Sequence, residues 1–207
     1  MSEGTLADAS RRRRTVAIAG HTGDLATVRE HLSDVNSSVR ATALGALARL
    51  GDVQADDLRA ALADADPQVR RRALEVVADL GGGGPAAAVA ILPLLDDPDE
   101  TVVEVAAWAS GERSPAEPGA VAALARLATE APDALVREAA VAALGSLGDP
   151  SGLPAILAAC GDKATVRRRA VLALAPFEGE EVDAALARAL DDRDWQVRQA
   201  AEDLTQH

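Results

Sequence analysis

Apolar residues recur along the chain at the spacing of an amphipathic α-helix. In one block they stand at Val69, Ala73, Leu74, Val77 and Leu80, and a turn of about 100° per residue gathers these positions on one arc of the helix. The pattern returns in six blocks that align on Val39, Val69, Val102, Val136, Val166 and Val197, with successive spacings of 30, 33, 34, 30 and 31 residues. A second apolar helical stretch precedes each block, as at residues 58–64 and 153–160. The sequence therefore predicts an all-α repeat protein built from pairs of short helices.

Each block begins with a residue suited to start a helix. Three residues before the aligned valine stand Asn36, Asp66, Asp99, Asp133 and Asp194, whose side chains can accept hydrogen bonds from the free amides of a first turn. Lys163 takes this place in the remaining block, with Asp162 beside it. Glycine-rich turns end most blocks, as at residues 81–84, so we expect tight connections rather than linkers.

The blocks read as aspartate, a few residues, Val-Arg, then Ala and Leu at helical spacing. This pattern resembles the HEAT repeat, in the short form found in phycobilin-lyase-like proteins. The resemblance covers residues 25–207 and implies a right-handed α-solenoid of about six helical pairs, with residues 1–24 as an N-terminal tail and capping helix. The family includes scaffolds, lyase subunits, a hydroxylase and a DNA glycosylase branch, so the resemblance specifies a fold and not a function.

An arginine directly follows the aligned valine in most blocks, at Arg40, Arg70, Arg137, Arg167 and Arg198. This position lies about 100° from the valine, inside the buried arc, so each arginine needs a partner. Six residues before three of them, in the turn between the two helices of the same repeat, stand Asp34, Asp64 and Asp192. We expect stacked repeats to align these groups as a structural ladder of charge-assisted hydrogen bonds. The ladder has gaps: Val103 replaces one arginine, and Ala131 and Gly161 take two aspartate positions.

Other residues of the same helices point away from the buried arc. The second helices of stacked helical repeats usually line the concave surface, where such proteins bind. Trp108 lies at about 240° from its valine and would anchor a partner, unless its repeat is rotated and the indole covers a neighbouring loop. Glu75, Glu104 and Glu138 share this face and make it a mixed-charge groove. The predicted partner-binding residues are Trp108, Arg71, Arg72, Val105, Arg168, Arg169 and Leu172.

Composition and charge narrow the possible partners. The net charge of −12 opposes attraction to nucleic acid or anionic lipid. The apolar stretch after Arg14 is too short for a signal peptide or a membrane span, so we expect a cytoplasmic protein. A single lysine against many arginines is typical of a GC-rich bacterium. The run Arg11–Arg14 is either a solvated face or a docking site for an acidic partner or nucleic acid.

Catalytic chemistry finds little support in the sequence. Cys160 is the only cysteine, which excludes an intrachain disulfide and favours a buried apolar role. The histidines His21, His31 and His207 lack the following glutamate of the iron-binding His-Glu pairs in the hydroxylase branch. We therefore expect no metal and no cofactor. Trp195 is interpreted as a lid on the last repeat, and the loop Gly111–Gly119 as a spacer.

The sequence thus predicts a non-enzymatic scaffold or adaptor that binds a protein partner through its concave helix face. Two alternatives stay open. One is a nucleic-acid-binding or DNA-glycosylase-like repeat protein, and the other is an accessory subunit of a lyase-type enzyme.

Overall fold

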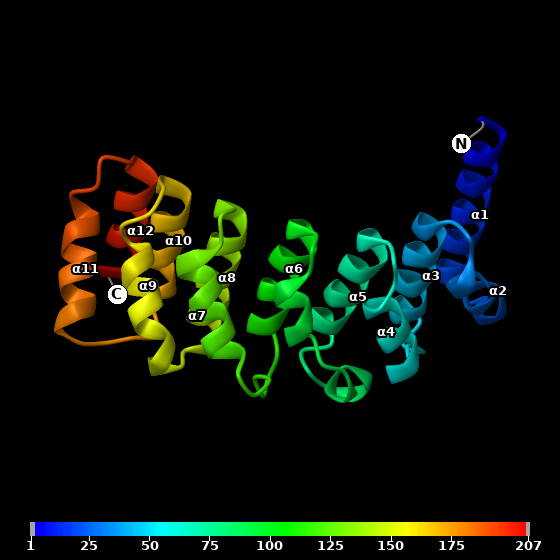
Figure 1. The fold of residues 1–207 in the computed structure, drawn as a ribbon, viewed down its shortest axis with the longest axis horizontal. Helices are drawn as coiled ribbons and strands as arrows, with labels where there is room; N and C mark the ends of the chain where they lie inside the picture. The colour runs from blue at the N-terminus through cyan, green and yellow to red at the C-terminus, as the bar shows by residue number, and fades with distance from the viewer. Residues whose placement is uncertain (1–2, 206–207) are drawn as a thin grey trace. The chain divides into compact units, whose positions relative to one another are not determined.

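The protein is all-α, as predicted: the computed structural model describes residues 3–205, and in that range it contains helices and turns without a β-strand (Figure 1). The chain divides into two compact units, Met1–Ile91 and Leu92–His207. The first holds α1 (Glu3–Thr22), α2 (Leu25–Glu30), the 3-10 helix η1 (His31–Ser33), α3 (Ser37–Arg49), α4 (Ala55–Leu62), α5 (Pro67–Asp79) and η2 (Gly84–Ala88). The second holds η3 (Leu92–Asp96), α6 (Glu100–Gly111), α7 (Ala120–Glu130), α8 (Ala134–Leu147), η4 (Pro150–Gly152), α9 (Leu153–Ala159), α10 (Ala164–Ala173), α11 (Glu180–Leu190) and α12 (Trp195–Thr205).

Within each unit the helices pack in two rows. In the first unit α1 packs on α3 and α3 on α5, while α2 and α4 pack against α3 and α5. In the second unit α6, α8, α10 and α12 follow one another, and α7, α9 and α11 each pack against the next helix of that row. Six of the helices in these rows are the second helix of a repeat, and α1 packs on α3 in the same row. We call all seven the second helices: α1, α3, α5, α6, α8, α10 and α12.

The predicted helix starts are confirmed. The side chains of Asn36, Asp66, Asp99 and Asp133 each accept a hydrogen bond from a backbone N–H two residues further on, at 2.6 to 3.1 Å. All six aligned valines are buried. Leu80 differs from its prediction: as the residue that ends α5 it is exposed, because the turn that follows leads it away from the core.

The first helix of the third repeat is the exception to the predicted helical pairs. Residues 84–96 form the two 3-10 helices η2 and η3 in place of an α-helix. Pro85 and Pro93 each lack the N–H that an α-helical hydrogen bond needs, and the glycines of residues 81–84 disfavour a helical start. The division between the two compact units falls inside this segment, after Ile91.

Small residues let successive second helices approach closely. Where α8 meets α10, a methyl group on Gly145 would lie 2.7 Å from the Cβ atom of Ala173. Gly111 on α6 has the same relation to Ala143 on α8. The alanine-rich composition thus serves close helix packing, and a larger side chain at such a point forces the helices apart.

The arginines after the aligned valines form a ladder, but with a register that differs from the predicted one. Arg40 donates from Nε and Nη2 to the two carboxylate oxygens of Asp64, in the next repeat, at 2.8 and 2.7 Å. It reaches Asp34, in its own repeat, only at the backbone carbonyl, at 2.8 Å. The same arrangement joins Arg137 to the carboxylate of Asp162, and Arg167 to that of Asp192. Pairing of each carboxylate with the arginine of its own repeat, as the sequence analysis expected, is therefore wrong.

The turn geometry explains this register. Asp64 Oδ1 also accepts the backbone N–H of Asp66 at 2.9 Å, a local turn that fixes the direction of the carboxylate. The Arg70 guanidinium of the same repeat donates to the carbonyl of Asp64 at 2.8 Å, as Arg198 does to the carbonyl of Asp192 at 2.7 Å. Each arginine thus joins the turn of its own repeat, and Arg40, Arg137 and Arg167 also reach the carboxylate of the next.

The shifted register also accounts for gaps that look unrelated in the sequence. Val103 removes the arginine of the third repeat, and Ala131 stands at the aspartate position of the fourth, so both partners of one rung are absent together. Both replacements are buried. An apolar rung of this kind avoids a buried charge without a partner. In the fifth repeat, Asp162 supplies the carboxylate from the position after Gly161.

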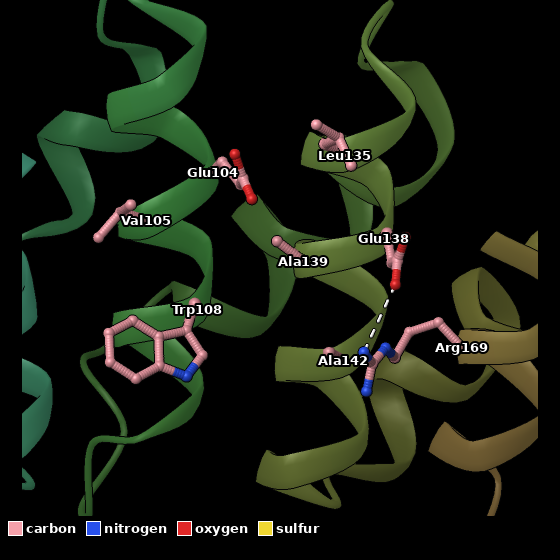
Figure 2. Close-up of a pocket in the computed structure, with 8 residues that line it drawn as sticks. All are labelled: Glu104, Val105, Trp108, Leu135, Glu138, Ala139, Ala142 and Arg169. Atoms are coloured by element: carbon pink, nitrogen blue, oxygen red, sulfur yellow. Dashed lines mark hydrogen bonds and ion pairs between the residues drawn. The ribbon is translucent and has the colours of Figure 1, made fainter. Parts of the chain in front are cut away.

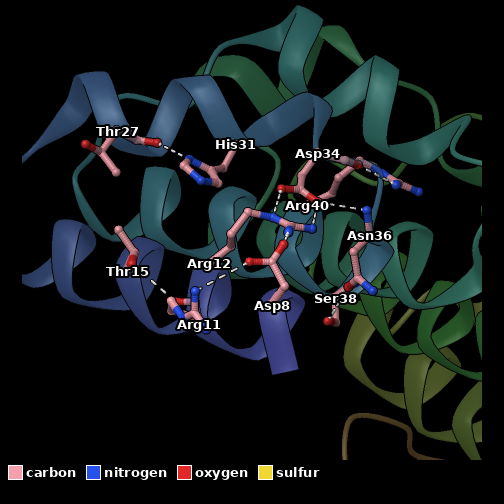
Figure 3. A network of polar contacts seen from close by, with 10 residues as sticks. All are labelled: Asp8, Arg11, Arg12, Thr15, Thr27, His31, Asp34, Asn36, Ser38 and Arg40. Atoms are coloured by element: carbon pink, nitrogen blue, oxygen red, sulfur yellow. Dashed lines mark hydrogen bonds and ion pairs between the residues drawn. The ribbon is translucent and has the colours of Figure 1, made fainter. Parts of the chain in front are cut away.

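The first rung comes from the N-terminal arginine run. Arg12 on α1 donates to the carboxylate of Asp34 at 2.7 and 3.0 Å and also contacts Asp8 (Figure 3). Arg11 and Arg14 are exposed. The members of the run Arg11–Arg14 thus have different roles, and Arg12 takes the place that Arg40 has on α3.

The ladder lowers the pKa values of its carboxyl groups. The hydrogen bond from Arg40 holds the pKa of Asp64 below its ordinary value near 3.8, and Arg12, Arg137 and Arg167 do the same for their aspartates. A carboxyl group whose pKa is lower in the folded than in the unfolded state stabilises the fold above the unfolded pKa, and this contribution is lost as the pH falls.

We expect the pH dependence of unfolding to report the ladder. The free energy of unfolding should stay level near neutral pH and fall below a pH of about 4, where the unfolded aspartates bind protons before the folded ones do. Asp192→Asn removes one such group, so its urea midpoint should drop less than that of the wild type between pH 7 and pH 3. An equal drop in both proteins would contradict the assignment.

A double-mutant cycle should confirm the register of the ladder. Because the Arg40 and Asp64 side chains bond directly, Arg40→Ala and Asp64→Ala should show a coupling energy of roughly 1.5 to 3 kcal/mol in urea unfolding, the range for a hydrogen bond to a charged group. Arg70→Ala with Asp64→Ala should couple far more weakly, since Arg70 bonds to the Asp64 backbone. A larger coupling energy between Asp64 and Arg70 than between Asp64 and Arg40 would instead support pairing within one repeat.

Replacing the close-contact glycine should destabilise the second unit. Gly145→Ala should lower the free energy of unfolding by about 1 to 3 kcal/mol through overpacking against Ala173. The matched control is Gly45→Ala, also within a helix, where the added methyl meets only the Arg72 side chain, at 3.4 Å or more. That variant should be neutral or more stable by up to about 1 kcal/mol, because alanine favours helix. Equal urea midpoints for the two variants would refute the close-packing argument.

Candidate partner-binding groove

The outward side chains of α6, α8 and α10 line a groove of about 440 Å³ in the second unit (Figure 2). Glu104 and Trp108 stand four residues apart on α6, and the α8 lining residues stand at positions i, i+3, i+4 and i+7, so each set falls on one helix face. The lining consists of Glu104, Val105, Trp108, Leu135, Glu138, Ala139, Ala142 and Arg169. We call this set the Trp108 groove.

Trp108 is the largest side chain of the groove, and it is 40% exposed. Its indole extends from α6 on the same side as Val105 (Figure 2). Val102 and Ala106 on the opposite face of α6 are fully buried, so the helix keeps the orientation of its counterparts. The exposure of the indole therefore does not result from a rotated repeat.

The charges of the groove are only partly paired. Arg169 Nη2 lies 3.4 Å from Glu138 Oε1, a long contact for a charged pair. The Nε atom of Arg169 is buried without a hydrogen-bond partner in the described chain. Glu104 makes no ion pair or hydrogen bond to another described residue. The Glu104 carboxylate and the weakly held Arg169 guanidinium thus give the groove one charged group on α6 and one on α10.

The structure brings together only part of the predicted binding set. Trp108, Val105 and Arg169 line the Trp108 groove. Arg168 is exposed and outside this lining, whereas Leu172 is half-buried and packs against the core between α10 and α12. Arg71 and Arg72 belong to the first unit, where they line a different groove.

The sequence analysis missed the residues that α8 contributes without charge, which are Leu135, Ala139 and Ala142. Leu135 is 57% exposed. It directly precedes the aligned valine, so it lies at about 260° on the helical wheel, close to the direction of Trp108. The same wheel would have found it, whereas the two alanines carry no signal that separates a groove floor from ordinary helix packing.

The residues considered for catalysis lie elsewhere. Cys160 lines a second cavity, formed by residues of α9 to α12. Burial raises the pKa of its thiol, which reduces the thiolate available for nucleophilic attack. His31 Nδ1 lies 2.8 Å from the carbonyl of Thr27, and His207 is outside the described residues. Residues 3–205 contain no group of His, Cys, Asp and Glu arranged to hold a metal ion.

None of the helices in the described chain has the length and apolar character needed to cross a membrane. Trp195, at the start of α12, is 65% exposed. It lies outside the Trp108 groove.

Several solved structures share the fold. The Escherichia coli protein YibA is 19% identical, with a TM-score of 0.71 over 95% of this chain and 76% of its own. A designed armadillo repeat protein in complex with the peptide (KR)4 is also 19% identical, with a TM-score of 0.64 over 86% of this chain and 96% of its own. An engineered protein is 21% identical, with a TM-score of 0.62 over 88% of this chain and 97% of its own.

No curated protein sequence matches the chain significantly. The sequence pattern of HEAT repeats, in contrast, matches residues 55–145 and 130–204. These matches cover five of the six aligned valines and most of the chain, so the protein belongs to the HEAT-repeat family.

Proposed function

We propose that the protein is a non-enzymatic scaffold or adaptor that binds a protein partner on the outward face of its second helices. The half-exposed indole of Trp108 in a formed groove carries this proposal. Tryptophan buries a large apolar area with little loss of side-chain entropy and is enriched among residues that dominate binding energy.

The composition of the Trp108 groove supports binding rather than nucleophilic chemistry. Apolar side chains alternate with two carboxylates and one guanidinium, and the lining includes no hydroxyl, thiol or imidazole group. An apolar centre with a polar rim is the usual composition of a protein-recognition site. The carboxylates and the net charge of −12 disfavour nucleic acid at this surface.

The fold is suited to such a role because it presents side chains from successive helices at fixed intervals. A designed armadillo repeat protein of similar fold is in complex with the peptide (KR)4. Glu104 and Glu138 give the Trp108 groove two carboxylates that could pair with cations of a bound peptide, while the indole face can stack on them.

Panning a random peptide library on the full chain, followed by fluorescence anisotropy on the enriched peptides, tests this proposal. Trp108→Ala should weaken peptide binding about 30-fold or more, which corresponds to about 2 kcal/mol, the scale of an interface hot spot. The variant should stay folded with a cooperative thermal transition, since Val102 and Ala106 on the opposite face of α6 carry its core packing.

The matched control is Trp195→Ala, which removes another exposed tryptophan outside the groove. This variant should keep full affinity. The proposal fails if Trp108→Ala binds the peptides as the wild type does, or if it melts far earlier, because the indole would then be a packing residue.

A further inference from the structure

The first unit has a groove of its own on the outward face of its second helices. It has a volume of about 330 Å³ and is lined by Arg13, Ser38, Ala41, Thr42, Gln68, Arg71, Arg72 and Glu75. The residues come from α1, α3 and α5, and α3 packs against both of the other helices. We call this set the arginine groove. Arg71 and Arg72, predicted from the sequence to share one binding surface with Trp108, line this groove instead.

The arginine groove has more cations than anions. Its lining carries three guanidinium groups and one carboxylate. Glu75 pairs with Arg72, whose Nη1 lies 2.8 Å from Oε2. Arg13 makes no ion pair to a described residue, and the Nε atom of Arg71 is buried without a hydrogen-bond partner in residues 3–205. The net positive charge therefore belongs to Arg13 on α1 and Arg71 on α5, on either side of α3.

The hydroxyl groups between these arginines do not satisfy them. Ser38 Oγ donates to Asn36 Oδ1 at 2.6 Å, and Thr42 Oγ1 donates to the carbonyl of Ser38 at 2.7 Å. The free donors of the groove are thus the guanidinium N–H groups and the side-chain amide of Gln68. A carboxylate that accepts a hydrogen bond from a guanidinium N–H forms a strong charge-assisted pair.

We propose that the arginine groove binds an acidic segment of a protein partner, with carboxylates of the segment accepting hydrogen bonds from Arg13 and Arg71. Because the two arginines lie on helices separated by α3, the cations extend along the groove and fit an extended chain. Nucleic acid is the less favoured ligand, since the lining has no aromatic side chain on which a base could stack and the net charge of the protein is −12.

This inference goes beyond the proposed function, because it assigns a second surface and the chemistry of its ligand. It also stands on different residues. Loss of peptide binding at Trp108 leaves the arginine groove intact, and the two proposals can therefore fail separately.

Fluorescence anisotropy with the full chain at about 0.15 M salt, the physiological range, tests the inference. The probes are a fluorescein-labelled peptide of alternating Glu and Ser, its counterpart with Lys in place of Glu, and a single-stranded oligonucleotide of the same charge as the acidic peptide. We expect saturable binding of the acidic peptide only. Arg71→Glu and Arg13→Glu should each weaken this binding at least tenfold.

The matched control is Arg14→Glu, which makes the same charge change at an exposed residue of α1 outside the groove. It should keep the affinity of the wild type within twofold, as should Trp108→Ala. Urea midpoints show whether each variant is folded, and Arg13→Glu, at an exposed position, serves if Arg71→Glu unfolds. The inference is overturned if the wild type does not bind the acidic peptide, or if Arg14→Glu weakens binding as much as Arg71→Glu does. It is also overturned if the wild type binds the oligonucleotide more tightly than the acidic peptide and Arg71→Glu abolishes that binding.

Discussion

The structure depends on one repeated interaction, in which an arginine of a second helix joins two successive repeats. Its guanidinium donates to a carbonyl in the turn of its own repeat and to the carboxylate in the turn of the next, as Arg40 does with Asp34 and Asp64. The same carboxylate caps its own turn. Because three nitrogen atoms of one rigid guanidinium donate to acceptors on two repeats, the spacing and orientation of neighbouring helices are set together.

Close helix packing complements the ladder. At points such as Gly145 against Ala173, the absence of a side chain brings the helix backbones together, and the apolar arc of each second helix is buried against the first helices. The inner positions are thus fully used by packing and by the ladder. The outward positions carry less of this packing, so their composition can differ from repeat to repeat at a smaller cost to the fold.

The two units use this freedom in different ways. In the second unit, Trp108 with Glu104 and Glu138 forms a groove of aromatic and acidic character. In the first unit, the equivalent helices present Arg13 and Arg71 in a polar groove. We infer that each unit recognises a different chemistry, as an adaptor requires, although the chain as a whole is strongly acidic. In these proposals the local side-chain charge selects the ligand of each groove, and the net charge of −12 disfavours nucleic acid at both.

The sequence by itself determined the all-α fold, the six repeats, the helix starts and the inward direction of the arginines, because helical periodicity and capping are local properties of the chain. Only the tertiary structure decided the register of the ladder, since that depends on how neighbouring repeats stack. It also placed Arg71 and Trp108 in different grooves, packed Leu172 against the core of the second unit and made Arg12 the first rung. A helical wheel gives the direction of a side chain but not the residues that it contacts, and a groove is lined by residues from several helices.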